Sequence, residues 1–92
     1  MVQKYIERPL LFKGRKFDIR VWALVNGKNE VFMYRHGYLR TSSDDYNLTN
    51  GNNYVHLTNN CLQKFGTNYG VHEDGNTVGF HIFQAYLDEH YP

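Results

Sequence analysis

An alternating run of apolar and charged residues that ends at a turn most limits what this chain can fold into. In residues 15–25 apolar side chains recur at every second position, and the positions between them begin with three charged residues, Lys16, Asp18 and Arg20. Alternation with a period of two is typical of a β-strand. Residues 26–29 read Asn-Gly-Lys-Asn, and Asn and Gly tolerate the positive φ of a tight turn. The pattern predicts a hairpin whose return strand covers residues 30 to about 41.

The remaining residues predict mainly loop, with one helix at the end. Residues 2–6 have the pattern of a short strand, which Arg8-Pro9 interrupts. Residues 42–53 form a polar loop, residues 54–57 a short extended piece, and residues 58–77 an irregular stretch with one helical turn near Leu62.

The predicted helix runs from about Val78 to His90, with Thr77 as its N-cap and Phe80, Phe83 and Leu87 on one face. The fold class is therefore α+β: an antiparallel hairpin sheet, a long loop and a C-terminal helix.

Composition excludes several classes of function. The 92 residues make at most one domain, and the net charge of +1 does not suit a nucleic-acid arm or a polybasic membrane patch. No apolar run approaches the roughly 20 residues that span a bilayer. A single cysteine, Cys61, excludes an internal disulfide and favours a reducing, cytoplasmic setting. The expected partners therefore include neither nucleic acid nor membrane.

The polar face of the hairpin has two interpretations. Counting back from the turn sets Trp22 opposite Met33, Arg20 opposite Arg35, Asp18 opposite Gly37 and Lys16 opposite Leu39. Two arginines facing each other repel, and a bound polyanion would remove that repulsion because arginine binds phosphate and carboxylate bidentately. The face is then an anion-binding surface on a rigid sheet. A solvated strand face gives the same pattern, and the pattern alone leaves both interpretations open.

Other polar residues give weaker signals. The hydroxyl and amide groups of Thr58, Asn59 and Asn60 suit a phosphate or carboxylate ligand, and they equally suit a hydrogen-bonded turn. His56 fits a structural histidine better than a catalytic one, because no nucleophile stands at a triad spacing. The five histidines show no metal-binding spacing, so no metal site is predicted.

Several strings, taken together, resemble the tubulin–tyrosine ligase family and its ligase-like members. They are Gln3-Lys4-Tyr5-Ile6, Lys16-Phe17-Asp18-Ile19-Arg20, Tyr38-Leu39-Arg40-Thr41-Ser42-Ser43, His56 to Lys64, Asn68-Tyr69-Gly70 and Glu73-Asp74-Gly75-Asn76. They cover nearly the whole chain, in order. The stretch Arg40-Thr41-Ser42-Ser43 followed by Tyr46-Asn47, with the pair Asn60-Cys61, most resembles the tyrosine-adding members, and polyglutamylases and polyglycylases share most of the rest.

The resemblance implies an ATP-grasp fold, of which residues 1–92 are a central fragment. Such enzymes are ATP-dependent carboxylate–amine ligases, which use ATP with Mg²⁺ to turn a carboxylate into an acyl phosphate that an amine then attacks. Here the implied partners are a free amino acid (tyrosine, glutamate or glycine) and the C-terminal tail of tubulin. The implied setting is the cytoplasm, with the cytoskeleton or a cilium as the place of action.

The resemblance also implies a role for individual residues. The cofactor-binding set would be a hinge that meets adenine, Gln3, Lys4, Tyr5 and Ile6, with the nucleotide contacts Lys16 and Asp18 and the phosphate-lining Thr58 and Asn59. Arg20 would be catalytic, facing the phosphates or the acyl phosphate. Arg40 would hold the carboxylate of the incoming amino acid, beside Asn60 and Cys61.

Two further expectations follow from that assignment. Simple alternation places Arg40 on the face opposite to Arg35, so Arg40 reaches the site only if pairing breaks at His36-Gly37, where glycine permits a bulge. The magnesium ligands of the family, an aspartate and a later Glu-x-Asn, have no counterpart here. The fragment alone is therefore expected to be inactive, and a truncated module that binds nucleotide or tubulin without catalysis is the alternative.

Overall fold

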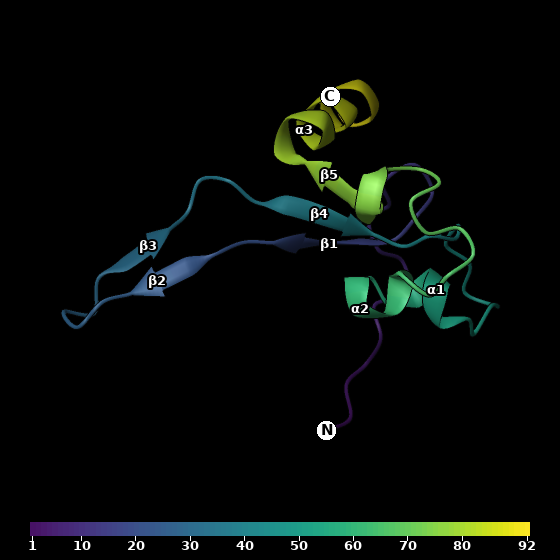
Figure 1. Cartoon of the computed structure of the whole chain (residues 1–92), viewed down its shortest axis with the longest axis horizontal. Helices are drawn as coiled ribbons and strands as arrows, with labels where there is room; N and C mark the ends of the chain where they lie inside the picture. The colour runs from purple at the N-terminus through teal and green to yellow at the C-terminus, as the bar shows by residue number, and fades with distance from the viewer.

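The predicted hairpin forms as two short antiparallel ladders in place of one continuous ladder. In a computed structural model, which describes residues 1–92, the elements follow the chain as β1 (Phe17–Arg20), β2 (Ala23–Val25), β3 (Val31–Met33), β4 (Tyr38–Thr41), α1 (Asn53–His56), α2 (Asn60–Gln63), the 3₁₀ helix η1 (Asp74–Asn76), β5 (Thr77–Gly79) and α3 (Phe80–His90). Strands β2 and β3 pair only with each other, while β1, β4 and β5 form a second sheet in that order. Figure 1 shows the β2–β3 hairpin projecting from the rest of the molecule. The predicted α+β class with antiparallel sheets and a C-terminal helix is confirmed.

The pairing register differs from the expected one. Ala23, not Trp22, lies opposite Met33, and beyond the break Asp18 pairs with Arg40 and Arg20 with Tyr38. The predicted pairs Arg20–Arg35, Asp18–Gly37 and Lys16–Leu39 are therefore wrong. The turn closes through a hydrogen bond from the Asn26 amide to the Glu30 carbonyl at 3.1 Å, which shifts the ladder by one residue.

The predicted break near Gly37 is confirmed. Between the two ladders the first strand has two residues, 21–22, whereas the return strand has four, 34–37. Two surplus residues keep the alternation of faces, so Arg40 shares a face with Asp18 because of the turn register and not because a bulge switches the faces. A side chain at Gly37 would collide with the sheet and the helix, since a Cβ there would lie 2.5 Å from the Arg20 carbonyl oxygen and 2.6 Å from the Phe80 ring.

The apolar core lies between the three-stranded sheet and α3. Its fully buried members are Phe12, Leu39 and Val78, and four partly buried aromatic side chains close around them, Phe17, Phe80, Phe83 and Tyr86. Strand β5 precedes the helix directly, so the N-cap is Gly79 and the helix begins at Phe80. The predicted start at Val78 with Thr77 as cap is wrong, because Thr77 and Val78 pair with β4 instead.

Local structure departs from the predictions at two other places. Residues 2–6 form no strand, and residues 53–56 form a helical turn, α1, where an extended piece was predicted. The Asn52 side chain caps this turn by accepting the Tyr54 amide at 2.8 Å. The predicted helical turn near Leu62 is confirmed as α2.

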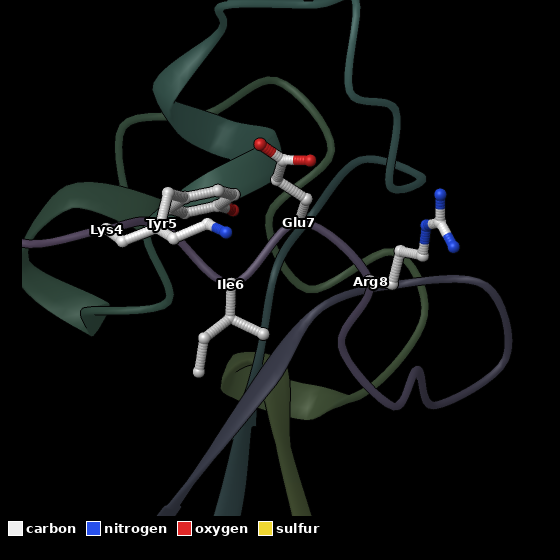
Figure 2. Close-up of a pocket in the computed structure, with 5 residues that line it drawn as sticks. All are labelled: Lys4, Tyr5, Ile6, Glu7 and Arg8. Carbon is white, nitrogen blue, oxygen red and sulfur yellow. The ribbon is translucent and has the colours of Figure 1, made fainter.

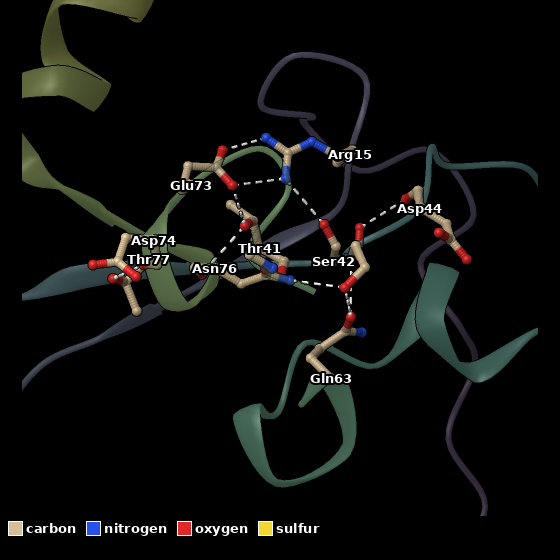
Figure 3. A network of polar contacts seen from close by, with 11 residues as sticks. Arg15, Thr41, Ser42, Asp44, Gln63, Glu73, Asp74, Asn76 and Thr77 are labelled. Carbon is tan, nitrogen blue, oxygen red and sulfur yellow. Dashed lines mark hydrogen bonds and ion pairs between the residues drawn. The ribbon is translucent and has the colours of Figure 1, made fainter. Parts of the chain in front are cut away.

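A buried polar network, which no sequence pattern indicated, ties the long loop to the end of β4 (Figure 3). The Arg15 guanidinium is 1% exposed and forms a bidentate ion pair with Glu73, with a further hydrogen bond of 3.1 Å to the Ser42 carbonyl. The Thr41 hydroxyl donates to the same carboxylate at 3.1 Å. Because a buried charge is stable only when it is paired and hydrogen-bonded, the loop carrying Glu73 is fixed against the sheet.

Two buried side-chain amides extend this network. Asn76 donates to the Thr41 carbonyl at 3.1 Å and to the Ser43 hydroxyl oxygen at 2.9 Å, while its own oxygen accepts the Gly70 amide. Gln63 of α2 accepts both the Ser43 amide, at 2.9 Å, and the Ser43 hydroxyl, at 2.6 Å. No buried side-chain polar atom lacks a partner, so the network is complete.

No helix here has both the length and the apolar character to cross a membrane.

Candidate functional site

The predicted site lies on the polar face of β1 and β4, opposite the face that packs on α3. In Figure 1, α3 lies on one side of this sheet, and α1, α2 and the N-terminal segment lie on the other. Hydrogen bonds from Lys16 to Tyr5 and to the carbonyl of His56 confirm that the N-terminal segment and α1 border this face.

Asp18 and Arg40 form the centre of this face. Their Cα atoms are register partners, and the Arg40 Nε donates to Asp18 Oδ1 at 2.8 Å while Nη2 pairs with Oδ2. The side chains are 21% (Arg40) and 39% (Asp18) exposed. The hydrogen bond with Asp18 raises the pKa of Arg40 against the opposing effect of burial, and charge interactions with Asp18, Tyr38 and Cys61 add to it. A guanidinium held in this way keeps its remaining N–H groups in a fixed position for an anion.

Lys16 lies on the same face and is also held. Its ammonium donates to the His56 carbonyl at 2.9 Å and to the Tyr5 hydroxyl oxygen at 3.2 Å, and it lies 4.7 Å from the centre of the Tyr5 ring. A groove of about 400 Å³ runs beside it and is lined by Gln3, Lys4, Tyr5, Ile6, Pro9, Lys16 and Phe17. The structure thus brings all four predicted hinge residues together with Lys16.

A second pocket, of about 370 Å³, lies along the same N-terminal segment and is lined by residues 4–8 (Figure 2). Figure 2 shows the side chains of Tyr5 and Ile6 pointing to opposite sides of the segment. The main chain of residues 3–6 makes no regular pairing, so its polar groups remain open to a ligand.

Arg20 stands apart from the Asp18–Arg40 pair. It is exposed, forms no ion pair, and its guanidinium carbon lies 5.9 Å from the centre of the Trp22 ring. Thr58 is buried and Asn59 is exposed, and the Asn59 carbonyl accepts the amides that begin α2. No hydrogen bond links Thr58 or Asn59 to Lys16, the residue with which they were predicted to bind the nucleotide.

Asn60 and Cys61 begin α2 and face different neighbours. The Asn60 amide donates to the Gly75 carbonyl at 3.2 Å and its oxygen accepts the Tyr69 hydroxyl at 3.3 Å, so this side chain points to the loop. Cys61 is exposed, and a charge interaction with its thiol adds to the rise in the pKa of Arg40. Of these two residues, Asn60 is therefore hydrogen-bonded to the loop, and only Cys61 acts on the charge of Arg40.

His56 and Tyr46 make contacts at this site that the sequence did not predict. His56 was predicted to be structural, and both of its ring nitrogens are hydrogen-bonded, to Tyr5 at 2.8 Å and to the Asn50 carbonyl at 2.5 Å. The Tyr46 hydroxyl donates to the Glu7 carbonyl at 2.7 Å. Partial removal from water, with a hydrogen bond to Tyr5, raises the pKa of Tyr46. No spacing in the sequence marks these contacts, because they join residues 39 and 51 positions apart.

No group of three or more histidine, cysteine, aspartate or glutamate side chains converges as a metal site would require.

Comparison with known proteins gives the family that the motifs indicated. A family model described as the tubulin-tyrosine ligase family matches residues 1–91. Tubulin glycylase 3A of Drosophila melanogaster is 46% identical over 93 residues, which cover 95% of this chain and 9% of that protein. Human tubulin monoglycylase TTLL3 is 44% identical over 95 residues, 97% of this chain and 12% of the relative. Human protein monoglycylase TTLL8 is 45% identical over 67 residues, 71% of this chain and 8% of the relative.

This chain spans about a tenth of the length of these relatives. All three are glycylases by name, whereas residues 40–43, Tyr46-Asn47 and Asn60-Cys61 most resemble the tyrosine-adding members. The match over residues 1–91 nevertheless leaves one conclusion at the level of the family: this chain belongs to the tubulin-tyrosine ligase family.

Proposed function

We propose that this chain supplies part of the nucleotide- and amino-acid-binding face of an ATP-dependent ligase with an ATP-grasp fold, which adds an amino acid to the C-terminal tail of tubulin. Membership of the tubulin-tyrosine ligase family and the names of the relatives support tubulin as the substrate. The observation that carries the proposal is the held Asp18–Arg40 pair, with Lys16 on the same sheet face. A tubulin-modifying role also supports action at the cytoskeleton or in a cilium.

The proposed reaction has two steps. A carboxylate oxygen of the tail attacks the γ-phosphorus of ATP, so ADP leaves and an acyl phosphate forms. The amine of the free amino acid then attacks the acyl carbon, phosphate leaves, and an amide bond remains. Transfer of a phosphoryl group depends mainly on positioning and on neutralising charge, which fixed cations supply.

Each residue of the site has a part in this proposal. Lys16 binds the phosphates, while the main chain of residues 3–6 meets the adenine edge. Arg40, held by Asp18, binds the α-carboxylate of the amino acid beside Cys61. Arg20, which is exposed, contacts the acyl phosphate as the tail approaches from solvent. Thr58 and Asn59 would line the phosphates, with Asn60 beside the amino acid.

Mg²⁺ would neutralise charge on the phosphates in such chemistry. The side chains of this chain do not form a site for it, and we expect these 92 residues alone to be inactive.

We infer glycine as the amino acid. Arg40 would hold the α-carboxylate of tyrosine, glutamate and glycine equally well, so the choice does not rest on Arg40. The relatives named above are glycylases, and glycine brings no side chain that requires a pocket of its own.

A module that binds nucleotide or a tubulin tail without catalysis is the second candidate. The held Asp18–Arg40 pair and Lys16 would bind an anion in such a module as well.

Incorporation of labelled amino acids tests both candidates. The full-length protein is incubated with ATP, tubulin and labelled glycine, glutamate or tyrosine in separate reactions. We expect glycine to be incorporated, and Lys16→Ala to lower the rate by at least about tenfold, as loss of a bond to a charged group does. Lys28→Ala, which removes an exposed lysine of the hairpin turn, is the matched control. Binding of ATP without incorporation supports the module. If the protein neither binds ATP nor incorporates an amino acid, both candidates are overturned.

A further inference from the structure

His56 connects the N-terminal segment to Lys16 through a chain of hydrogen bonds. Its Nδ1 lies 2.8 Å from the Tyr5 hydroxyl, and its Nε2 lies 2.5 Å from the Asn50 carbonyl oxygen. The Tyr5 oxygen accepts a hydrogen bond from the Lys16 ammonium at 3.2 Å. The rings of Tyr5 and Tyr46 both meet the imidazole in edge-to-face arrangements, with centroids 5.5 and 5.6 Å away, so the imidazole is packed by two aromatic rings.

The partners of His56 fix the direction of this chain. A backbone carbonyl only accepts, so Nε2 carries the proton that it donates to Asn50. In the neutral imidazole Nδ1 is then an acceptor, and the Tyr5 hydroxyl must donate to it. That leaves the lone pairs of the Tyr5 oxygen for the Lys16 ammonium. Each group in the chain donates to the next, from Lys16 to Tyr5 to His56 to Asn50.

We propose that His56 is a positioning residue for the groove beside Lys16, in which the nucleotide would bind. By accepting a hydrogen bond from the Tyr5 hydroxyl, His56 leaves the lone pairs of the Tyr5 oxygen facing Lys16 and so fixes the place of the ammonium. This inference rests on the proposed function, in which Lys16 binds phosphate. His56 itself does not line the groove of about 400 Å³.

The flexibility of a lysine side chain explains why the Lys16 ammonium requires partners that position it. A lysine side chain has four rotatable carbon–carbon bonds and loses considerable freedom when its end is fixed. Here the ammonium is held from two sides, by the Tyr5 oxygen and by the carbonyl of His56, and it lies 4.7 Å from the centre of the Tyr5 ring. The contact with the Tyr5 oxygen depends on the His56 ring, whereas the contact with the carbonyl of residue 56 is a main-chain contact that variants of His56 keep.

A double-mutant cycle on ATP affinity tests the proposal. The matched variants are His56→Asn, whose side-chain oxygen takes the place of Nδ1, and His56→Gln, which can donate to Asn50 but leaves the Tyr5 hydroxyl without its acceptor. Measured by calorimetry on the full-length protein, His56→Gln and Tyr5→Phe should each weaken ATP binding about tenfold, the size of one lost hydrogen bond to a charged group. His56→Asn should stay within about threefold of wild type.

The double variant Tyr5→Phe/His56→Gln separates positioning from a general structural role. If His56 acts through Tyr5, the double variant binds ATP about as weakly as either single variant. If the two losses multiply, or if His56→Asn is as weak as His56→Gln, the proposal is overturned.

Nitrogen NMR of the imidazole gives a readout that needs no nucleotide. We expect a neutral ring protonated at Nε2, and we expect Tyr5→Phe to shift the Nδ1 resonance while the Nε2 resonance stays in place. Protonation at Nδ1 in the neutral ring, or no response to Tyr5→Phe, overturns the inference. If Lys16→Ala leaves ATP affinity unchanged, the proposed function fails and this inference with it. If Lys16→Ala weakens binding but Nδ1 gives no response, only the inference fails.

Discussion

Arg20 and Arg40 lie on the same face of the sheet but differ in how firmly their neighbours hold them. Arg40 is clamped by Asp18 and is only 21% exposed, while Arg20 on the same sheet face has no ion pair and rests near an exposed indole. A clamped guanidinium has already lost the freedom that binding would otherwise take from it. For this reason we assign recognition of the small amino acid to Arg40 and contact with the incoming tail to Arg20.

Replacing Arg40 with lysine tests that assignment. A single ammonium cannot pair with both Asp18 oxygens and also present fixed N–H groups, so we expect Arg40→Lys to raise the KM for the amino acid about tenfold or more. The KM for ATP should change little. Arg35→Lys is the matched control, because Arg35 is exposed and unpaired in the same return strand. Equal effects of the two variants on the amino-acid KM would contradict the assignment.

The buried Arg15–Glu73 ion pair is expected to contribute to the stability of the fold. Glu73→Gln leaves the Arg15 charge buried without its counter-ion, and we expect it to lower the free energy of unfolding by about 3 kcal/mol or more. Urea denaturation measures this change. Glu89→Gln is the control: its side chain is 77% exposed, and the expected change is within about 0.5 kcal/mol. A small effect at Glu73 would mean that the buried network does not hold the loop.

Tyr46 gives a prediction for alkaline pH. Its raised pKa means that the folded protein keeps the phenol neutral where the unfolded chain would ionise it. The contribution of Tyr46 to stability is therefore complete below the unfolded pKa of about 10 and is lost as the pH rises through the folded value. An ultraviolet titration should show a late tyrosine ionisation that Tyr46→Phe removes. Its persistence in that variant would assign it to another tyrosine.

At the scale of elements, the sequence predicts the strands and helices that a local pattern specifies. It does not predict the register or the short strand that depend on pairing with a distant segment. The alternation in residues 15–25 and the apolar face of the last helix were enough for the strands and for α3. The register was wrong by one residue at the turn, because alternation does not say which Asn or Gly closes the loop. Strand β5 was missed because three residues have no period of their own, and only pairing with β4 extends them.

Gly37 is where the break in the ladder can be tested. A Cβ at this position would lie within 2.6 Å of both the Arg20 carbonyl oxygen and the Phe80 ring, so strand and helix would have to move apart. We expect Gly37→Ala to destabilise the fold by about 1–3 kcal/mol, measured by thermal or urea unfolding. Gly27→Ala is the control, since a Cβ there meets no atom within 4 Å. Equal stability of the two variants would place the close contact in doubt.

For the site, the alternation predicted that Lys16, Asp18 and Arg20 share a strand face and left its function open, and the resemblance supplied the roles. Simple alternation put Arg40 on the opposite face, and it lies beside Asp18 because the turn register differs from the expected one. The buried polar network was beyond prediction, because Arg15, Gln63 and Glu73 have no spacing that distinguishes them from surface residues. Their burial follows from the way the loop folds back over β4.

The whole molecule has a small core and a large surface. Only 11 of the 92 residues are buried, and the accessible surface is 7046 Å². A compact monomer of 10.9 kDa would expose about 5,600 Å². Much of the apolar part of this surface lies on the projecting hairpin, where a hollow of about 310 Å³ is lined only by hydrophobic side chains, Trp22, Ala23, Leu24, Phe32, Met33 and Tyr34.

This surface predicts self-association of the isolated chain. Exposed apolar patches of this kind are sites of association, so sedimentation velocity should show a mass that rises with concentration. The double variant Leu24→Thr/Phe32→Thr should reduce that rise. Its unfolding free energy should change by less than about 1 kcal/mol, because both side chains are more than half exposed. A chain that stays monomeric at every concentration would contradict the prediction.

The surplus residues at positions 34–37 also bear on how this protein tolerates change. A continuous ladder would pass every insertion near the turn on to β4, and an odd one would rotate Arg40 away from Asp18. Here an irregular stretch separates the projecting hairpin from the paired segment that holds Arg40. An insertion in the projecting hairpin can therefore be absorbed by residues 34–37, so that the register that places Arg40 opposite Asp18 stays the same.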